Sequence, residues 1–296
     1  MKITHKYQPL LRLTSAVVLG YVSIYIANQA RVGELFINND NLSQAVGLIL
    51  SYLLLFIVTA TSLKNLKDRK WKTGILFSIV LVILFFVILK GYDKSIKYTL
   101  KISPFYISVL LGVVSGYFYV AWKNNKLIIP ILFLIFPFIM SFGGYNLWLH
   151  RVEYGNFFGS VDKSRVIPFE LINKEGEVIN NESLKGKVVL FDFWYISCNP
   201  CWVKFPELQR TYEKYQSNPM VEIYAVNRPM KRDKQGELFT RIEKKNYTFP
   251  VLQGTQEIMD SFDVYVYPTV ILLNREGEVV FMGELEDAEK TIQSLF

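Results

Sequence analysis

Residues 188–194 of this chain read Val-Val-Leu-Phe-Asp-Phe-Trp, and residues 198–201, shortly after them, read Cys-Asn-Pro-Cys. An almost unbroken apolar run of this length predicts a β-strand that is buried on both faces of a sheet. Residues 202–215 then repeat their apolar side chains at helical spacing. The cysteine pair is therefore expected at the turn where a buried strand passes into a helix.

This position suggests a chemical role for the two cysteines. The helix dipole and the free amides of a first turn stabilise a thiolate, which favours Cys198 as a nucleophile. Cys201 follows about one helical turn later, near enough to form a disulfide with Cys198. Between them, Asn199 is followed by Pro200, a residue that suits the first turn of a helix. The pattern predicts a redox-active dithiol.

Other interpretations of the pair compete with this one. A zinc site needs about four ligands, and the sequence adds only His5 and His150 to the cysteines. Covalent haem attachment needs a histidine at the position of Trp202. Peroxidase chemistry of the peroxiredoxin kind is not expected, because no Pro-x-x-x-Thr-x-x-Cys precedes either cysteine. An inert structural disulfide stays open, although it would close a very short loop and stabilise little. We expect no metal and no other cofactor.

Strand and helix patterns alternate around the pair. Strands are expected at residues 169–172, 177–179, 221–226, 268–273 and 279–282, and helices at residues 202–215, 234–245 and 287–296. Such alternation is typical of a central sheet with helices on its faces. The C-terminal half is thus predicted to be a small α/β domain.

Two separated motifs in this half resemble the thioredoxin superfamily. The first is Lys-Gly-Lys-Val-Val-Leu-Phe-Asp-Phe-Trp at residues 185–194 with Cys-Asn-Pro-Cys at 198–201 and Phe-Pro at 205–206. The second is Tyr-Pro-Thr at residues 267–269, which resembles the cis-proline segment of that fold. The likeness covers residues 167–296, and the most similar branch is that of the membrane-tethered TlpA/ResA-like thiol–disulfide oxidoreductases. It implies a thioredoxin-like domain with a mixed central sheet.

The resemblance also implies roles for individual residues. Cys198 would be the attacking cysteine and Cys201 the resolving one. Pro268 would be the cis-proline that faces the disulfide, although an ordinary proline at the start of a strand would give the same sequence. Residues implied to contact the client protein are Trp194, Asn199, Pro200, Tyr267 and Thr269. For Trp194, a place in the core is an equally good interpretation.

The sequence departs from this family at two positions beside the pair. Many relatives carry an acid three residues after the second cysteine, where this chain has Lys204, and Ser197 stands where relatives often have tryptophan. The buried strand offers Asp192 as a replacement acid. Burial should raise the pKa of Asp192, so that it could take the proton of Cys201 during exchange. An aspartate held by backbone donors is the alternative.

The N-terminal half has a different composition. Hydrophobic residues make up 51% of the chain and charged residues only 20%. Five runs without charged residues, at 13–30, 45–62, 73–89, 104–122 and 127–149, each approach the ~20 residues that cross a bilayer. Gly112 and Gly116 would let two helices approach closely, and Pro130 and Pro137 predict a kink in the fifth run. Because charged residues inside spans usually mark ion paths, their absence favours a packed anchor over a transporter.

The charge distribution excludes nucleic acid as a partner and suggests an orientation. The chain has a net charge of +7, but residues 1–150 hold 15 Lys and Arg against 4 Asp and Glu, so the basic half is the apolar one. With a cytoplasmic N-terminus, ten Lys and Arg of the termini and loops lie inside and five outside, which agrees with the positive-inside rule. Five spans then place residue 151 onward outside a bacterial cytoplasmic membrane.

Together these patterns predict a transmembrane helical domain (residues 1–150), a polar linker (151–166) and a thioredoxin-like domain (167–296). The predicted function is reduction of protein disulfides on the extracytoplasmic side, through a mixed disulfide. The spans contain no cysteine, so a separate membrane or extracytoplasmic electron donor is expected. The alternatives are a disulfide oxidant or isomerase, and a membrane module that binds a partner and senses redox state through the pair.

Overall fold

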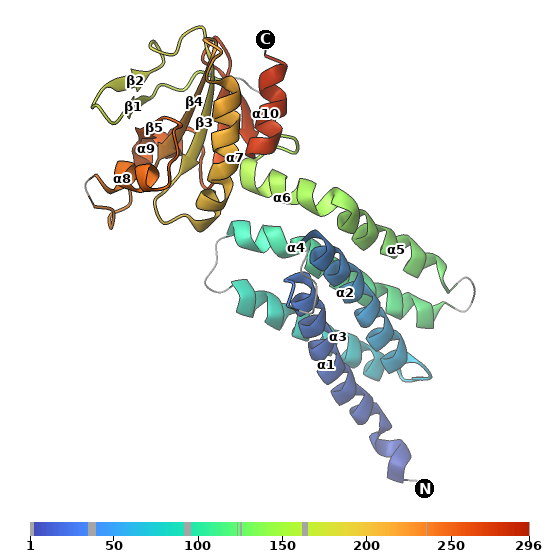
Figure 1. Ribbon diagram of the computed structural model, residues 1–296. Coiled ribbons are helices and arrows are strands. Elements are labelled where there is room, and N and C mark those ends of the chain that lie inside the picture. Colours follow the sequence, from blue (N-terminus) through green and yellow to red (C-terminus); the bar gives the residue numbers. More distant parts are fainter. Residues whose placement is uncertain are drawn as a thin grey trace. The chain divides into compact units, whose positions relative to one another are not determined.

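The computed structural model describes the chain except for residues 1–2, 35–39, 92–95, 123, 125, 162–164, 235 and 296. The chain divides into two compact units, Met1–Leu149 and His150–Phe296. Each is described by itself below, with the element labels of Figure 1.

The first unit consists of helices. They are α1 (Ile3–Arg31), α2 (Asp40–Leu63), α3 (Arg69–Gly91), α4 (Ile96–Ala121) and α5 (Ile128–Ile139), which continues through a π-helical turn (Met140–Gly144) into α6 (Tyr145–Tyr154). Five stretches, the last being Ile128–Tyr154, are long and apolar enough to cross a membrane. The five predicted apolar runs are thereby confirmed as helices.

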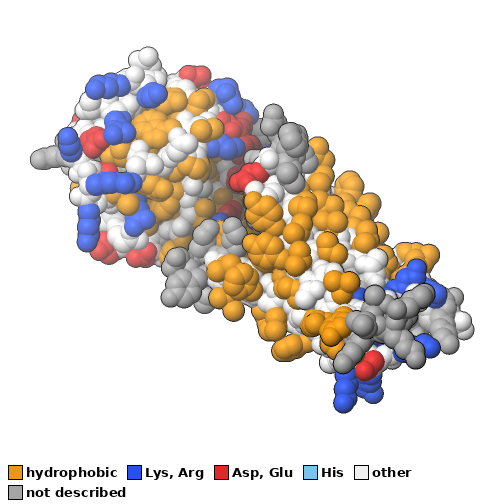
Figure 2. Space-filling view, turned by 90° about the horizontal axis from the view of Figure 1, so that it is seen from below, with side chains coloured by type: hydrophobic (Ala, Val, Ile, Leu, Met, Phe, Trp, Pro, Cys, Tyr) orange, Lys and Arg blue, Asp and Glu red, His pale blue; other side chains and the backbone are white. Residues whose placement is uncertain are grey.

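Apolar side chains also cover the outside of these helices. Leu81, Phe85 and Ile131 each leave about half of their surface exposed, and hydrophobic side chains cover much of the helical unit on the face that Figure 2 shows. Polar groups lie inside instead: the buried hydroxyl of Tyr52 donates to the carbonyl oxygen of Pro130 at 2.5 Å. A surface of this kind suits a lipid environment better than water.

The predicted close approach of two helices is confirmed. A Cβ atom added to Gly112 would lie 2.4 Å from the carbonyl oxygen of Tyr52, and one added to Gly116 would lie 2.7 Å from the Cβ of Thr59. Helix α4 therefore packs on α2 through two positions that have room only for glycine. The kink of the fifth span is present, but it lies beyond Pro137, where Gly143 adopts a φ of +108° that glycine accepts without steric cost.

The second unit is built on a seven-stranded mixed sheet. Its strands are β1 (Glu170–Ile172), β2 (Val178–Asn180), β3 (Val188–Trp194), β4 (Val221–Asn227), β5 (Val251–Gln253), β6 (Thr269–Leu273) and β7 (Val279–Gly283), in the order β2-β1-β5-β4-β3-β6-β7. Strands β3, β4 and β5 are parallel, whereas β6 and β7 run antiparallel beside β3. The predicted α/β domain with a mixed central sheet is confirmed.

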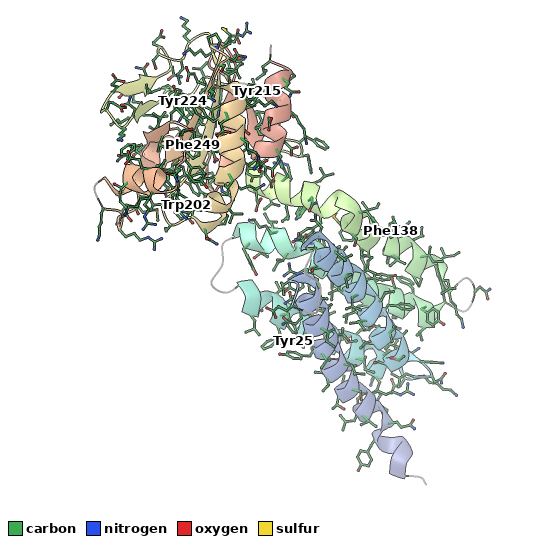
Figure 3. All side chains as sticks on the ribbon, viewed as in Figure 1. Tyr25, Phe138, Trp202, Tyr215, Tyr224 and Phe249 are labelled. Carbon is green, nitrogen blue, oxygen red and sulfur yellow. A yellow bond between two sulfur atoms is a disulfide. The ribbon has the colours of Figure 1, made fainter. Side chains whose placement is uncertain are left out.

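Every residue of β3 is buried, and its side chains alternate between two cores. Leu190 and Trp194 face one core, together with the two cysteines and α7 (Asn199–Tyr215), α8 (Glu237–Lys244) and α10 (Leu285–Gln293). Trp202 and Phe249 pack in this same core (Figure 3). Phe191 and Phe193 face the other core with α9 (Gln256–Ser261). The alternation places Asp192 on the α7 face.

Two details differ from the sequence prediction. Strand β5 and helix α9 were not expected, because each is too short to show a clear period. The segment expected to be a polar linker runs along the edge strand β7: Val161 donates its N–H to the carbonyl of Val280, and the side-chain amide of Asn156 donates to the carbonyl of Met282. Such pairing covers the exposed edge of the sheet.

Candidate active site

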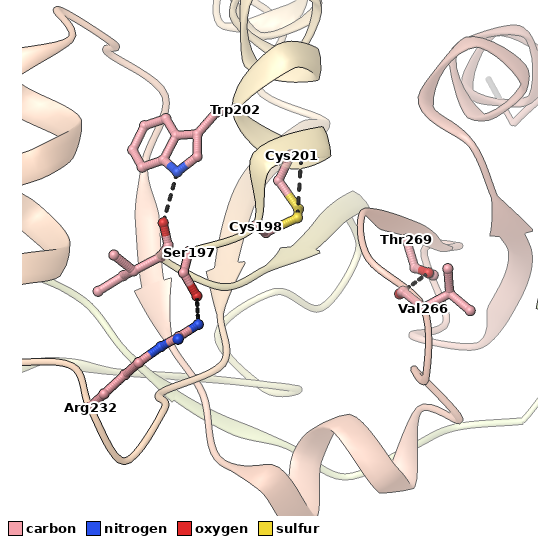
Figure 4. Close-up of a disulfide and its surroundings, with 8 residues drawn as sticks. Ser197, Cys198, Cys201, Trp202, Arg232, Val266 and Thr269 are labelled. Atoms are coloured by element: carbon pink, nitrogen blue, oxygen red, sulfur yellow. Dashed lines mark hydrogen bonds between the residues drawn. A yellow bond between two sulfur atoms is a disulfide. The ribbon is translucent and has the colours of Figure 1, made fainter. Parts of the chain in front are cut away.

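The two cysteines form a disulfide at the N-terminus of α7 (Figure 4). Cys198 is the N-cap residue, and its Sγ accepts a hydrogen bond from the N–H of Cys201 at 3.2 Å. Pro200 lies in the first turn, as the sequence predicts. Because the N–H of Cys201 in that turn points at the Cys198 sulfur, a thiolate there would be stabilised by both this hydrogen bond and the helix dipole.

The loop between β3 and α7 is fixed by three hydrogen bonds. The N–H of Cys198 donates to the carbonyl of Tyr195 at 2.9 Å. The indole N–H of Trp202 donates to the carbonyl of Ile196 at 2.8 Å, and Arg232 donates to the hydroxyl of Ser197 (Figure 4). The cysteine pair is therefore held by its own local backbone and by the loop after β4.

The peptide bond between Tyr267 and Pro268 is cis, in agreement with the family resemblance. Tyr267 and Pro268 line a cavity of about 510 Å³ together with Asn199 and Pro200 from between the cysteines. The fold thus brings the two motifs of the sequence, some seventy positions apart in the chain, to one site.

The other two predicted contact residues have different surroundings. Trp194 has no exposed surface and packs edge-to-face on Phe205 and Trp202, as a core residue does. Thr269 is 1% exposed, and its hydroxyl donates to the carbonyl of Val266 at 2.7 Å. Neither residue is among those that line the cavity, so this structure favours packing roles for both over contact with a client.

Asp192 lies at the inner wall of the same cavity. It is 1% exposed, and among the described residues its Oδ1 atom has no hydrogen-bond partner. Burial is the main reason why the pKa of Asp192 is raised to about 8; the charge of Glu207 adds to this effect and that of Lys204 opposes it. The alternative interpretation was that backbone N–H groups satisfy the Asp192 carboxylate. The described residues provide no such donor to its Oδ1 atom.

Acidic residues from α10 complete the cavity, and sequence reasoning missed them. The Lys204 ammonium forms an ion pair with Glu286 and lies 3.5 Å from the carboxylate of Glu207. Glu284 also lines the cavity, and burial raises its pKa. The sequence does show a cluster of acids, Glu284, Glu286 and Asp287, where the last predicted helix begins. These residues are more than eighty positions from Cys198, so the sequence alone does not place them at the same site.

The described residues contain no group of three His, Cys, Asp or Glu side chains that could hold a metal ion. The groups gathered here are a disulfide, a buried carboxylate and an ion pair around one cavity. These are the components that thiol–disulfide exchange requires.

The chain is similar to proteins of known fold and activity. Residues 163–282 match the family described as AhpC/TSA. Thiol-disulfide oxidoreductase ResA of Halalkalibacterium halodurans is 32% identical over 134 residues, which cover 43% of this chain and 73% of the relative. ResA of Bacillus subtilis is 37% identical over 117 residues, covering 38% of this chain and 61% of the relative. The solution structure of a putative thioredoxin from Neisseria meningitidis is 24% identical, with a TM-score of 0.40, and covers 45% of this chain and 91% of that one.

The fold and the Cys-x-x-Cys site define a thioredoxin-like protein. With the similarity to ResA, the chain belongs to the ResA family of thiol–disulfide oxidoreductases.

Proposed function

We propose that this chain reduces disulfides of proteins on the extracytoplasmic side of a bacterial cytoplasmic membrane, to which its N-terminal helices anchor it. The observation that carries the proposal is the disulfide at the N-terminus of α7 beside a cavity that both Asp192 and the Tyr267–Pro268 segment line. Residues 1–150 would be the anchor, residues 151–166 the connection and residues 167–296 the redox domain.

Reduction of a client begins with the dithiol form of the pair. The Cys198 thiolate attacks one sulfur of the client disulfide, a mixed disulfide forms, and the other client sulfur leaves as a thiolate. Cys201 then attacks Cys198, which releases the second client sulfur and restores the disulfide seen in the structure. Two electrons pass from the pair to the client, and the client thiolates take up two protons.

The geometry supports different roles for the two cysteines. Both are buried, with 1% of Cys198 and 0% of Cys201 exposed, but only Cys198 receives the N–H of the other at its sulfur, which stabilises a thiolate, while Cys201 lies one turn inside the helix. A buried thiol needs a base before it can attack. Asp192 has a raised pKa for a carboxyl group and a free Oδ1 among the described residues, so it is our candidate for that base.

Five apolar helices and the distribution of Lys and Arg support the membrane part of the proposal. An odd number of crossings would place the redox unit on the side opposite to the N-terminus. Since both cysteines of the chain are in the one pair, a separate membrane or extracytoplasmic electron donor would return it to the dithiol form.

A turnover measurement tests the proposed activity. We expect the purified full chain, in lipid nanodiscs with excess dithiothreitol, to reduce a disulfide-quenched fluorescent peptide over many cycles, faster than dithiothreitol alone. A rate equal to that of dithiothreitol alone would contradict an oxidoreductase role and favour a sensing module. Transfer of the chain's own disulfide to a reduced client, with the oxidised chain in stoichiometric amount and no other oxidant present, would favour an oxidant: the client dithiol is oxidised as the Cys198–Cys201 disulfide is reduced.

A further inference from the structure

The cavity beside the disulfide contains a second carboxylate that the proposed exchange reaction does not yet use. Glu286, in the first turn of α10, places Oε1 against the ammonium of Lys204. Its other oxygen, Oε2, is buried and has no hydrogen-bond partner among the described residues. Glu286 and Asp192 both line the cavity, and each has one buried oxygen atom without a hydrogen-bond partner among the described residues.

The sheet explains why these two carboxylates lie near each other. Asp192 in β3 is in register with Val270 in β6, which is in register with Gly283 at the end of β7. Neighbouring strands lie about 4.8 Å apart, so the backbones of Asp192 and Gly283 are roughly 10 Å apart. Strand β7 ends at Gly283, Glu284 caps helix α10, and the helix starts at Leu285. It packs on the same face of the sheet as Asp192.

Asp192 needs a nearby group through which it can exchange protons with solvent. At 1% exposure it cannot exchange protons directly with bulk water. The side chain of Glu286 is 41% exposed and also lines the cavity, so it is accessible to solvent and borders the cavity at the same time. The cavity, of about 510 Å³, has room for water molecules between the two carboxylates.

We propose that Glu286, held by Lys204, is the positioning residue that carries protons between Asp192 and solvent through this cavity. The inference rests on the proposed exchange function. When Cys201 attacks Cys198 of the mixed disulfide, its thiol proton passes to the Asp192 carboxylate, and the client leaves as a thiolate. The proton then moves through cavity water to Oε2 of Glu286 and on to solvent, which returns Asp192 to its starting state.

The ion pair keeps Glu286 ready for this transfer. Burial raises the pKa of Glu286, but the hydrogen bond and charge of Lys204, the hydrogen bond from its own backbone N–H and the neighbouring side chain of Glu207 outweigh that effect, so the pKa is lowered overall. Glu286 is therefore a carboxylate at neutral pH and holds a proton only in passing.

The chain offers a matched control for Glu286. Glu289 lies one turn further along α10 and pairs with Lys214 of α7, so it forms the same kind of contact between the same two helices. It does not line the cavity. Glu286→Gln and Glu289→Gln thus remove comparable ion pairs, but only the first removes a carboxylate from the cavity.

The test measures release of a fluorescent client from the mixed disulfide in single turnovers of the full chain. We expect Glu286→Gln to slow this step about tenfold, and Glu289→Gln to leave it unchanged. Small carboxylate buffers such as formate should restore the rate of Glu286→Gln in proportion to their concentration, and have no effect on the unaltered chain.

A double variant distinguishes loss of proton transfer from the effect of leaving the Lys204 ammonium without its ion-pair partner. If Glu286→Gln were slow only because Lys204 is left unpaired, Lys204→Met combined with Glu286→Gln would recover the normal rate. The proposal predicts that the double variant stays slow and is still rescued by formate. Equal rates for Glu286→Gln and Glu289→Gln, or absence of rescue, would overturn it. Failure of the unaltered chain to exchange at all would instead refute the proposed function.

Discussion

Replacement of Cys198 by serine is expected to lower turnover of the fluorescent disulfide by about a thousandfold or more. A serine hydroxyl at the N-cap would receive the same N–H from Cys201, but at neutral pH it supplies almost no anion and cannot form a mixed disulfide. The fold should tolerate the change, since serine is a preferred N-cap residue.

Cys201→Ser is the matched comparison, because it removes the other sulfur of the same disulfide. We expect this variant to attack the client normally and then to stop, so that client remains linked to Cys198 and appears as a reducible adduct on a non-reducing gel. Cys198→Ser should give no adduct. Full turnover by Cys198→Ser, or adducts that form on Cys201 instead, would contradict the assignment of the attacking cysteine.

Asp192→Asn should have the second largest effect. Loss of the base that accepts the proton of Cys201 is expected to slow release of the client about a hundredfold. Glu222→Gln is a suitable control, since Glu222 is a carboxylate on the neighbouring strand β4 that pairs with Lys187 at 2.6 Å, away from the cavity. Rates that fall equally in the two variants would indicate a general effect of removing charge from the sheet.

The pH dependence of the rate follows from the same group. Since the pKa of Asp192 is raised to about 8, its carboxylate form becomes the main one only above that pH. Client release by the unaltered chain should therefore rise with pH to about 8 and then level off. In Asp192→Asn this inflection should be missing. Measurement of the single-turnover rate between pH 6 and pH 9.5 in both proteins checks this prediction.

Stability should respond to pH through Asp192 in the opposite sense. Between its ordinary pKa of 3.8 and about 8, the folded chain binds more protons at Asp192 than the unfolded chain does. The free energy of unfolding must therefore fall as pH rises through this range. We expect Asp192→Asn to raise the thermal unfolding midpoint of the redox unit at pH 8 but not at pH 4. Equal shifts at both pH values would contradict the raised pKa.

Local patterns in the sequence were sufficient to predict the centre of the redox unit. The run at residues 188–194 is apolar on both faces because β3 lies between β4 and β6, and its length matches the strand that forms. Pro200 and the spacing of the cysteines likewise predict a helix that starts at the pair, since both depend on neighbouring residues only. The five apolar spans could also be predicted, because the length and composition of each run are local properties of the sequence.

Features that depend on distant parts of the chain could not be predicted. The pairing of Lys204 with Glu286 joins residues 82 positions apart in the sequence, and no local pattern at Lys204 predicts it. Likewise, the polar composition of residues 151–166 predicts a linker, but Ser160 and Val161 pair with β7, whose open edge is created only when the sheet forms. The burial of Trp194 between Trp202 and Phe205 is decided in the same way, by packing.

The most direct test of the account is to determine on which side of the membrane the cysteine pair reacts. Intact bacterial spheroplasts that contain the full chain are treated with a membrane-impermeant phosphine reductant and then with an impermeant maleimide mass tag. Lys67→Cys in a Cys198→Ser, Cys201→Ser background marks the loop after α2, which is expected to be cytoplasmic. The account predicts two tags on the unaltered chain in intact spheroplasts, and a tag at position 67 only after permeabilisation. Tagging of Cys198 and Cys201 only in permeabilised cells would contradict it.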